Sequence, residues 1–285
     1  MKQTRRTFMK NTAVASAAVM TMPSAFANSV MGKPKIGLGM FTVRDQMAAD
    51  PKGTLEKIAK IGYKRIEPFG FDGEKVFGMT GKEFKAVIDD LGLEYYSGHV
   101  NPPVFFEKFE QSLEFMNTVD QKYAAFPWVS PEERTIDHFK EIAEALNKCG
   151  EQAKSAGVTI CYHNHDFEFM EIDGQLPMDI LTKETDADLV KLELDLYWAV
   201  RAGVDPIEFF AKNEGRIPLW HVKDMADTKE KGFAEVGEGT IDFKSIFAKK
   251  KLSGMKAFFV EQDQSDDPLK SIEISYKNLS EKILG

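Results

Sequence analysis

The chain has 285 residues, and its formal net charge at pH 7 is −8. Because a protein that holds nucleic acid by its phosphates needs a basic face, this charge argues against a nucleic-acid partner. A chain of this length buries a full hydrophobic core without covalent staples. We therefore expect its two cysteines, Cys149 and Cys161, to be buried free thiols rather than a disulfide.

The first residues have the composition of an export signal. Arg5 and Arg6 form a twin-arginine pair in TRRTFMK, and an apolar run of small residues follows over 12–22. Ala25-Phe26-Ala27 then supplies an A-x-A cleavage site. We expect a twin-arginine signal peptide at 1–27 and export to a bacterial periplasm, with no membrane span left after cleavage.

Strand-like and helix-like segments alternate through residues 28–285, as is typical of βα units and a parallel sheet. No linker divides this segment, and its length is near the ~250 residues of one (β/α)₈ TIM barrel, so we predict one barrel domain over 28–285. An open doubly wound sheet is less favoured because Gly37 and Gly39 are not followed by a third glycine opening a helix. The candidate strands are 35–41, 64–69, 94–100, 123–129, 158–165, 190–198, 217–224 and 256–263.

Amphipathic helices are expected between the strands. The loop 235–243 is rich in glycine, but Glu235 and Glu238 would repel a phosphate there. We interpret it as a loop that shapes the barrel mouth, with Asp242 as the N-cap of the next helix. Three of the helices end at a glycine suited to a C-cap: 53–62 at Gly62, 81–92 at Gly92, and 138–157 at Gly157.

The last four strands carry metal-type ligands near their C-terminal ends, where parallel barrels place their chemistry. Because side chains alternate along a strand, residues i and i+2 share a face. Burying several ionisable groups together is costly unless they are paired or bind a cation. Their mixed nitrogen and oxygen donors suit Mn²⁺, Co²⁺, Fe²⁺ or Zn²⁺ better than Ca²⁺. The pairs are His163 and His165, Glu193 and Asp195, His221 and Lys223, and Glu261 and Asp263.

Other residues near the strand ends are weaker candidates. Glu193 is expected to be a structural partner of the ligands, and Asp166 and Asp263 are suited to capping the segments after them. Lys223 is interpreted either as a contact to a substrate oxygen or carbonyl or as a solvated surface group. For the two tryptophans in the set, core packing is the alternative to stacking against a sugar ring. The candidates for substrate contact are Glu67, His99, His165, Trp128, Trp198 and Lys223.

The segments GVTICYHNHDFEF, LELDLYW, WHVKD, VGEGTIDF and FVEQD resemble the sugar phosphate isomerase/epimerase superfamily, also called xylose-isomerase-like barrels. The resemblance extends from the first strand to the last helix and implies one divalent metal held by strands five to eight. Asp195, His221 and Glu261 match the last three ligands, and His163 occupies the position of a glutamate in the epimerases. Trp198 occupies a position where epimerases often carry a histidine that touches the substrate.

The resemblance implies proton abstraction next to the carbonyl of a small carbohydrate, with the metal, most suitably Mn²⁺, Co²⁺ or Zn²⁺, stabilising an enediolate. Glu261 is the expected base, and His163 is the second catalytic candidate. Isomerisation or epimerisation is the leading hypothesis. One alternative is a lyase or hydratase acting on 3-keto-glycosides, which suits an exported protein with a YHNH strand. The other is a non-catalytic periplasmic sugar-binding barrel. The oligomeric state stays open.

Overall fold

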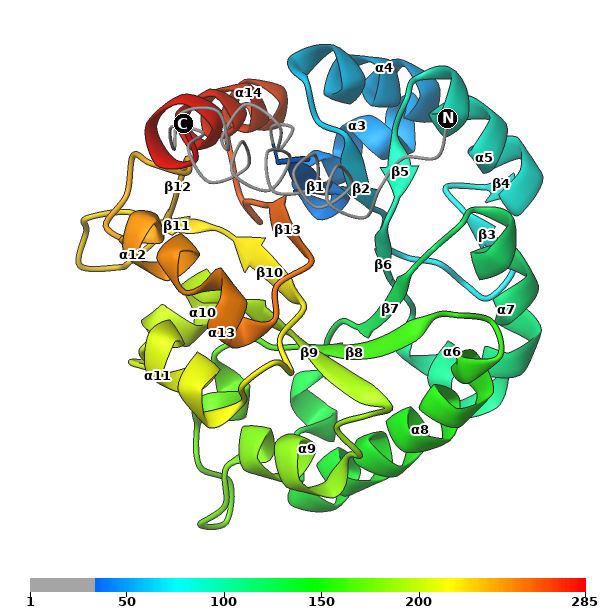
Figure 1. Ribbon diagram of the computed structural model, residues 1–285, viewed down its shortest axis with the longest axis vertical. Helices are drawn as coiled ribbons and strands as arrows, with labels where there is room; N and C mark the ends of the chain where they lie inside the picture. The colour runs from blue at the N-terminus through cyan, green and yellow to red at the C-terminus, as the bar shows by residue number, and fades with distance from the viewer. Residues whose placement is uncertain (1–33) are drawn as a thin grey trace, which may run out of the picture. The chain divides into compact units, whose positions relative to one another are not determined.

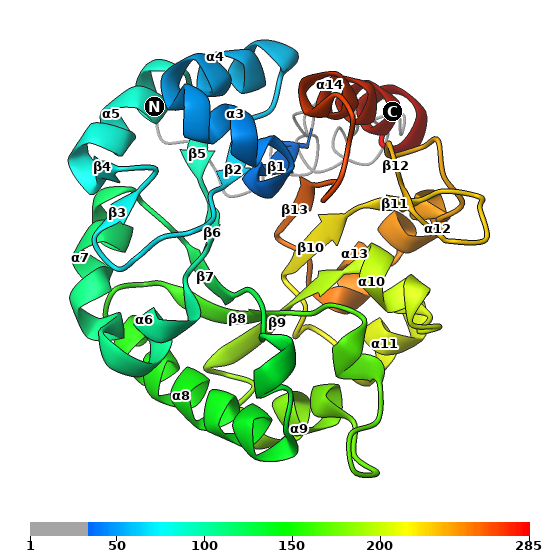
Figure 2. The same ribbon diagram turned by 180° about the vertical axis from the view of Figure 1, so that it is seen from behind.

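The computed structural model describes residues 34–285, so the predicted signal peptide at 1–27 lies outside the described residues. Parallel strands form a ring that is surrounded by helices, as Figures 1 and 2 show from opposite sides. The predicted (β/α)₈ barrel is confirmed. Its strands are β1 (Gly37–Gly39), β2 (Arg65–Glu67), β5 (Glu94–Tyr95), β6 (Ser97–His99), β7 (Tyr123–Phe126), β8 (Thr159–His163), β9 (Val190–Asp195), β10 (Leu219–Val222) and β13 (Ala257–Val260).

The third strand of the barrel is interrupted at Tyr96. Its first half, β5, pairs in parallel with β2, and its second half, β6, pairs in parallel with β7. Backbone hydrogen bonds bridge the interruption, because Tyr96 N donates to Ile66 O at 3.2 Å and His99 N donates to Pro68 O at 2.8 Å. β5 and β6 therefore act as one strand, and the sheet closes into an eight-stranded ring.

Helices follow the strands and cover the outside of the ring. Two short hairpins, β3 (Lys75–Val76) with β4 (Met79–Thr80) and β11 (Asp224–Met225) with β12 (Phe233–Ala234), extend from it. The α-helices are α3 (Arg44–Ala49), α4 (Pro51–Ile61), α5 (Gly81–Asp90), α6 (Pro102–Glu107), α7 (Phe109–Thr118), α8 (Ile136–Lys154), α9 (Pro177–Glu184), α10 (Leu196–Arg201), α11 (Pro206–Lys212), α12 (Phe243–Ala248), α13 (Lys250–Ser253) and α14 (Pro268–Asn278). Short turns of other helix types are η1 (Met40–Val43), η2 (Pro131–Glu133), η3 (Phe167–Phe169) and η4 (Leu279–Ile283).

Local sequence signals explain where these helices begin and end. In α5, the Thr80 hydroxyl accepts a hydrogen bond from Glu83 N while the Glu83 carboxylate accepts one from Thr80 N, which is a capping box. The Asp242 carboxylate accepts a hydrogen bond from Ser245 N at the start of α12, so the predicted N-cap is confirmed. The predicted C-cap glycines follow α4, α5 and α8 with positive φ: Gly62 at 126°, Gly92 at 65° and Gly157 at 68°.

The barrel interior has an apolar floor below its polar mouth. Ala125, Cys161, Leu219, Ala257 and Phe259 pack together in a buried cluster of their own. Several of these residues lie two positions before a candidate site residue on the same strand, as Cys161 does before His163. Since strand residues two apart share a face, the apolar cluster fills the barrel beneath the site. Cys149 and Cys161 are both buried free thiols, as predicted.

The predicted strands are all present but shorter than expected. The prediction placed Trp198 in a strand over 190–198, but β9 ends at Asp195 and Trp198 lies in α10. His165 likewise lies beyond the end of β8, and Glu261 lies beyond the end of β13. The candidate residues are thus carried partly by the loops that leave the strands.

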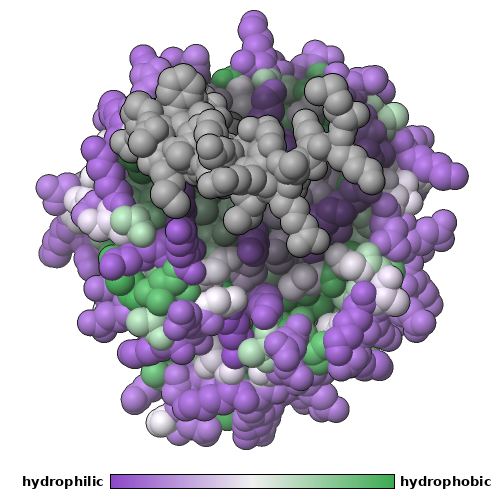
Figure 3. All heavy atoms as spheres, in the orientation of Figure 1, coloured by the Kyte–Doolittle hydropathy of each residue, from purple (hydrophilic) through white to green (hydrophobic). Residues whose placement is uncertain are grey.

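The surface seen in Figure 3 is mainly hydrophilic at its rim, with hydrophobic residues in separate patches. Within residues 34–285, no helix has the length and apolarity needed to cross a membrane.

Candidate active site at the mouth of the barrel

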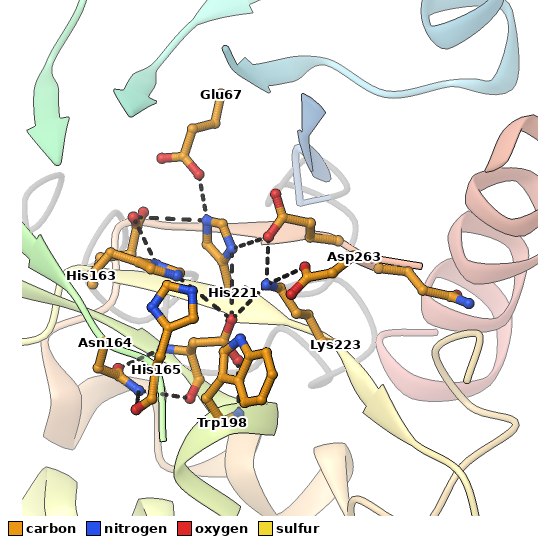
Figure 4. A network of polar contacts seen from close by, with 12 residues as sticks. Glu67, His163, Asn164, His165, Trp198, His221, Lys223 and Asp263 are labelled. Atoms are coloured by element: carbon orange, nitrogen blue, oxygen red, sulfur yellow. Dashed lines mark hydrogen bonds and ion pairs between the residues drawn. The ribbon is translucent and has the colours of Figure 1, made fainter. Parts of the chain in front are cut away.

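Polar side chains from the strand ends converge at the mouth of the barrel and form two overlapping groups (Figure 4). In each group, one potential ligand atom from every member lies within 4.8 Å of the others. We call them the histidine-rich group and the carboxylate group, and His221 belongs to both. The histidine-rich group comprises His99, His163, Glu193 and His221, and the carboxylate group comprises Asp195, His221 and Glu261.

The residues expected to bind metal are distributed over both groups. Asp195, His221 and Glu261 lie together, whereas His163 belongs to the histidine-rich group, with its Nε2 3.8 Å from Asp195 Oδ2. Glu193 contacts the other three members of its group, since its Oε2 lies 2.9 Å from His99 Nε2, 3.4 Å from His163 Nδ1 and 3.8 Å from His221 Nε2. All these side chains lie at one end of the barrel, and metal binding by them stays a prediction.

The chain positions Asp195 and Glu261 through local interactions. Asp195 is the N-cap of α10, and its Oδ1 accepts a hydrogen bond from Trp198 N at 3.0 Å. Its backbone N–H donates to Asn164 Oδ1 at 2.9 Å, which joins the ends of β8 and β9. At Gly39, a Cβ atom would lie 2.7 Å from Glu261 Oε1, so the absence of a side chain leaves room for the Glu261 carboxylate.

His221 lies between two carboxylates. Its Nε2 is hydrogen-bonded to Glu67, and its Nδ1 lies 2.9 Å from Glu261 Oε2. Burial disfavours the imidazolium, but Glu261 and Glu67 outweigh it and raise the pKa of His221 well above its usual value. Burial raises the pKa of Glu67, but His99 and His221 outweigh it and lower that pKa to about 2. A charged His221 must therefore lose a proton before it can bind a metal.

The histidine-rich group contains unpaired buried atoms that fit a metal. Burial, reinforced by His221 and His99, lowers the pKa of His163 well below its usual value, so its imidazole is neutral. Burial and the neighbouring Glu67 raise the pKa of Glu193 to about 7. Within the described residues, neither His163 Nδ1 nor Glu193 Oε1 has a hydrogen-bond partner. Because buried polar atoms are rarely left unpaired, this donor set fits a divalent cation.

Lys223 brings a buried positive charge into the carboxylate group. Its Nζ lies 2.6 Å from Glu261 Oε2, 3.0 Å from Asp195 Oδ2 and 2.6 Å from Asp263 Oδ1 (Figure 4). Burial lowers the pKa of Lys223, but these carboxylates outweigh it and raise that pKa well above the usual value. The alternative of a solvated surface lysine is therefore wrong, and Asp263 is a partner of Lys223 rather than a cap.

A cavity of about 590 Å³ opens at these groups, which is within the range of small-molecule sites. We call it the mouth cavity. Glu67 is buried beneath it, bonded to His221, and is absent from its lining. Trp198 Nε1 and His165 Nδ1 are buried and have no hydrogen-bond partner within residues 34–285. Of the predicted site residues, His99, Trp128, His163, His165, Trp198, Lys223 and Glu261 line the cavity.

Four aromatic or basic residues that line the cavity were not among the predicted site residues. The Arg134 guanidinium stacks on the Phe167 ring, 3.5 Å from its centroid, and both residues line the cavity. Phe41 and Phe69 add a second aromatic edge, with ring centroids 5.4 Å apart. The cavity therefore combines a charged floor with aromatic walls.

The glycine-rich loop after β12 is held by a carboxylate, which supports its interpretation as a shaping loop. Asp224 accepts backbone hydrogen bonds from Gly237, Gly239 and Ile241 at 2.8–3.1 Å. These N–H groups are consequently not available to a phosphate.

Glu168 is a buried carboxylate that the sequence analysis missed. Its two oxygens accept hydrogen bonds of 2.7 Å from Tyr162 Oη and His165 N. Burial nevertheless raises its pKa from 4.5 to about 8. The folded protein therefore retains a proton that the unfolded chain has released above about pH 4.5. The contribution of the protonated Glu168 to the free energy of unfolding is complete below about pH 4.5 and is lost as the pH rises through about 8.

Glu168→Gln is expected to remove this dependence, because an amide does not titrate. Thermal denaturation at about pH 5 and about pH 8 should show a smaller loss of stability in the variant than in the wild type. Glu171→Gln, at an exposed position nearby, is the control and should follow the wild type. Parallel pH profiles for Glu168→Gln and the wild type would contradict the assignment.

The fold and site define a class: a TIM barrel with a candidate metal centre at the C-terminal ends of its strands. A sequence profile of the xylose isomerase-like TIM barrel family matches residues 55–279. The chain belongs to this family, and the predicted superfamily is confirmed.

Known proteins similar to this chain include enzymes. An inosose dehydratase of Lacticaseibacillus casei is 28% identical over 166 residues, which are 53% of this chain and 55% of that protein. The match thus spans about half the length of that relative. A sugar phosphate isomerase/epimerase structure from Parabacteroides distasonis has 26% identity and a TM-score of 0.77, covering 90% of this chain and 97% of that one. The structure of IOLI protein with a binding zinc atom has a TM-score of 0.67 over 88% of this chain and 99% of that one, and at 17% identity it shows the fold alone.

Proposed function

We propose that this protein is a divalent-metal-dependent enzyme that removes the proton next to the carbonyl of a small carbohydrate and then eliminates an oxygen substituent. The observation that carries the proposal is that the two ligand groups overlap at the barrel mouth and that three of their members, His99, His163 and Glu261, line the mouth cavity. The similarity to an inosose dehydratase supports elimination. The similarity to a sugar phosphate isomerase/epimerase supports isomerisation or epimerisation as the second candidate, since both reactions share the first proton transfer.

The residues of the chain have distinct roles in this proposal. Asp195, His221 and Glu261, with His163, would hold the metal, which supplies Lewis-acid stabilisation of the negative charge that develops on the substrate oxygen. Glu261 accepts the α-proton, since its carboxylate lines the cavity and Lys223 keeps it ionised. His165 and Trp198 line the mouth cavity and would contact the substrate.

The choice between elimination and isomerisation rests on which groups face the substrate. The epimerases of this superfamily use a pair of carboxylates. In this chain an imidazole, that of His163, occupies one of the two positions. A neutral imidazole whose lone pair is given to a metal is poorly suited to return a proton to the opposite face. With one carboxylate base, the proton taken by Glu261 is instead available to the departing oxygen, which favours elimination.

A deuterium-exchange experiment tests this function. Protein stripped with a chelator and reloaded with Mn²⁺, Co²⁺ or Zn²⁺ is incubated in D₂O with inosose, with ketoses and with 3-keto-glycosides. We expect deuterium at the carbon next to the carbonyl and an unsaturated ketone product, both lost when the metal is removed. If the protein holds no metal, and a chelator leaves its melting temperature unchanged, the non-catalytic sugar-binding alternative is favoured.

We also propose that the protein is exported to the periplasm by the twin-arginine route, on the basis of the sequence pattern at residues 1–27. Replacing both Arg5 and Arg6 with lysine is expected to block export, because this route reads the arginine pair. Cell fractionation should find the double variant in the cytoplasm as folded protein. A control with Lys2 and Lys10 replaced by arginine should still be exported, and normal periplasmic accumulation of the Arg5/Arg6 variant would refute the proposal.

A further inference from the structure

A second cavity of about 490 Å³ lies beside the mouth cavity, over the loops that follow β6 and β7. We call it the side cavity. Its lining comes from α6, from residues 126–130, from the end of η2 and from the first turns of α8, and α6 packs against α8 (Figure 1). Trp128 lines both cavities. The two cavities therefore adjoin at Trp128.

Exposed aromatic side chains gather at these two cavities. Within residues 34–285, the large hydrophobic residues with high exposure are Phe41 at 39%, Phe106 at 42%, Trp128 at 42% and Met170 at 52%. Phe41 lines the mouth cavity, Phe106 lines the side cavity, and Trp128 lines both. Single exposed apolar residues need no explanation, but a group of them around two adjoining cavities indicates a binding surface.

The polar residues of the side cavity match a neutral sugar. Glu107, Glu133 and Glu141 line it, and Ser130 Oγ donates to Glu133 Oε2 at 2.7 Å. Carboxylates accept hydrogen bonds from hydroxyl groups but repel phosphate and carboxylate ligands. Among the described residues that line this cavity, none is a lysine or arginine. A pyranose presents both an apolar C–H face, which suits Trp128 and Phe106, and an edge of hydroxyls.

We propose that the side cavity binds the leaving sugar of a glycoside whose keto ring occupies the mouth cavity. This inference rests on the proposed function and identifies its leaving group. Glu261 takes the α-proton, and the electron pair of that C–H bond forms the carbon–carbon double bond. The bond between the β-carbon and the glycosidic oxygen then breaks, and the proton returns to that oxygen. The products are an unsaturated ketone and a free sugar, so atoms and electrons balance without an oxidant or reductant.

Equilibrium binding tests the proposal without any turnover. Glucose, cellobiose, maltose and phenyl β-glucoside are titrated into the metal-loaded protein by calorimetry. We expect at least one disaccharide to bind about tenfold more tightly than glucose, which corresponds to about 1.4 kcal/mol. Trp128→Ala and Phe106→Ala should each reduce this preference to less than about threefold, since each removes one stacking surface. Met170→Ala, which removes an exposed apolar side chain that lines neither cavity, should keep the full preference.

Three results would overturn the proposal. The first is equal affinity of the wild type for glucose and both disaccharides, and the second is a disaccharide preference that survives in both aromatic variants. Tightest binding of phenyl β-glucoside would also overturn it, because the side cavity would then select an aromatic group. Circular dichroism confirms that each variant is folded. Since these titrations need no reaction, a failure of metal-dependent deuterium exchange would reject the proposed function separately.

Discussion

Replacing Glu261 with glutamine is expected to slow exchange of the substrate α-hydrogen with solvent deuterium by about 10³-fold, within the range that general base catalysis contributes. The carboxylate is in the lining of the mouth cavity, and its Oε2 lies 2.6 Å from Lys223 Nζ. Burial raises the pKa of Glu261, but Lys223 and His221 outweigh it and hold that pKa well below its usual value. The group is therefore ionised and ready to accept a proton, whereas an amide cannot accept one. Nuclear magnetic resonance of substrate incubated in D₂O measures the rate.

Glu168→Gln provides the matched control, because it changes another buried carboxylate that does not line the mouth cavity. Its exchange rate should stay within about twofold of the wild type, while the metal content of both variants is measured. An unchanged rate in Glu261→Gln would place the base elsewhere. His165 is then the next candidate, because it lines the cavity and its Nδ1 has no partner within residues 34–285.

Replacing Lys223 with methionine is expected to destabilise the metal-free protein by about 3–5 kcal/mol, the usual effect of removing one partner from a buried ion pair. Asp195, Glu261 and Asp263 would lose the ammonium group that lies within 3.0 Å of all three. Urea denaturation in the presence of a chelator measures the loss. An added divalent metal should recover more stability in this variant than in the wild type, because the cation then neutralises the same carboxylates.

Lys256→Met, at an exposed lysine, is the control for this experiment and should change the unfolding free energy by less than about 0.5 kcal/mol. Equal stability of Lys223→Met and the wild type without metal would mean that the ion pairs of Lys223 do not hold the carboxylate group together.

The barrel could be predicted from the sequence because each of its units carries a local signal. Strand-like runs and amphipathic helices alternate along the chain, and three of the helices end at a capping glycine, as the helix over 53–62 does at Gly62. The break in the third strand at Tyr96 could not be predicted. EYYSGHV has the pattern of one continuous strand, and the interruption arises because its two halves pair with different neighbours, β2 and β7.

The candidate site was partly predictable for the same reason. The two-residue period predicts that His221 and Lys223 share a face, and the structure brings His221 into the two ligand groups and Lys223 into the lining of the mouth cavity. Contacts between strands depend on register, which the sequence of a single strand does not contain. Glu193 was expected to be a supporting residue, and only the pairing of β8 with β9 brings it beside His163. Of the side cavity the sequence indicated only Trp128, because the rest of its lining is brought together from separate elements, among them α6 and α8.

The two oxygens of the Asp195 carboxylate serve different parts of the molecule. Oδ1 holds the first turn of α10, the helix that carries Trp198, while Oδ2 faces Lys223 and the ligand groups. A shift of this carboxylate toward a bound cation therefore pulls on the helix that supports an aromatic wall of the cavity. The position of the Asp195 carboxylate and the position of Trp198 are therefore linked. We expect Trp198 fluorescence to change when a cation binds.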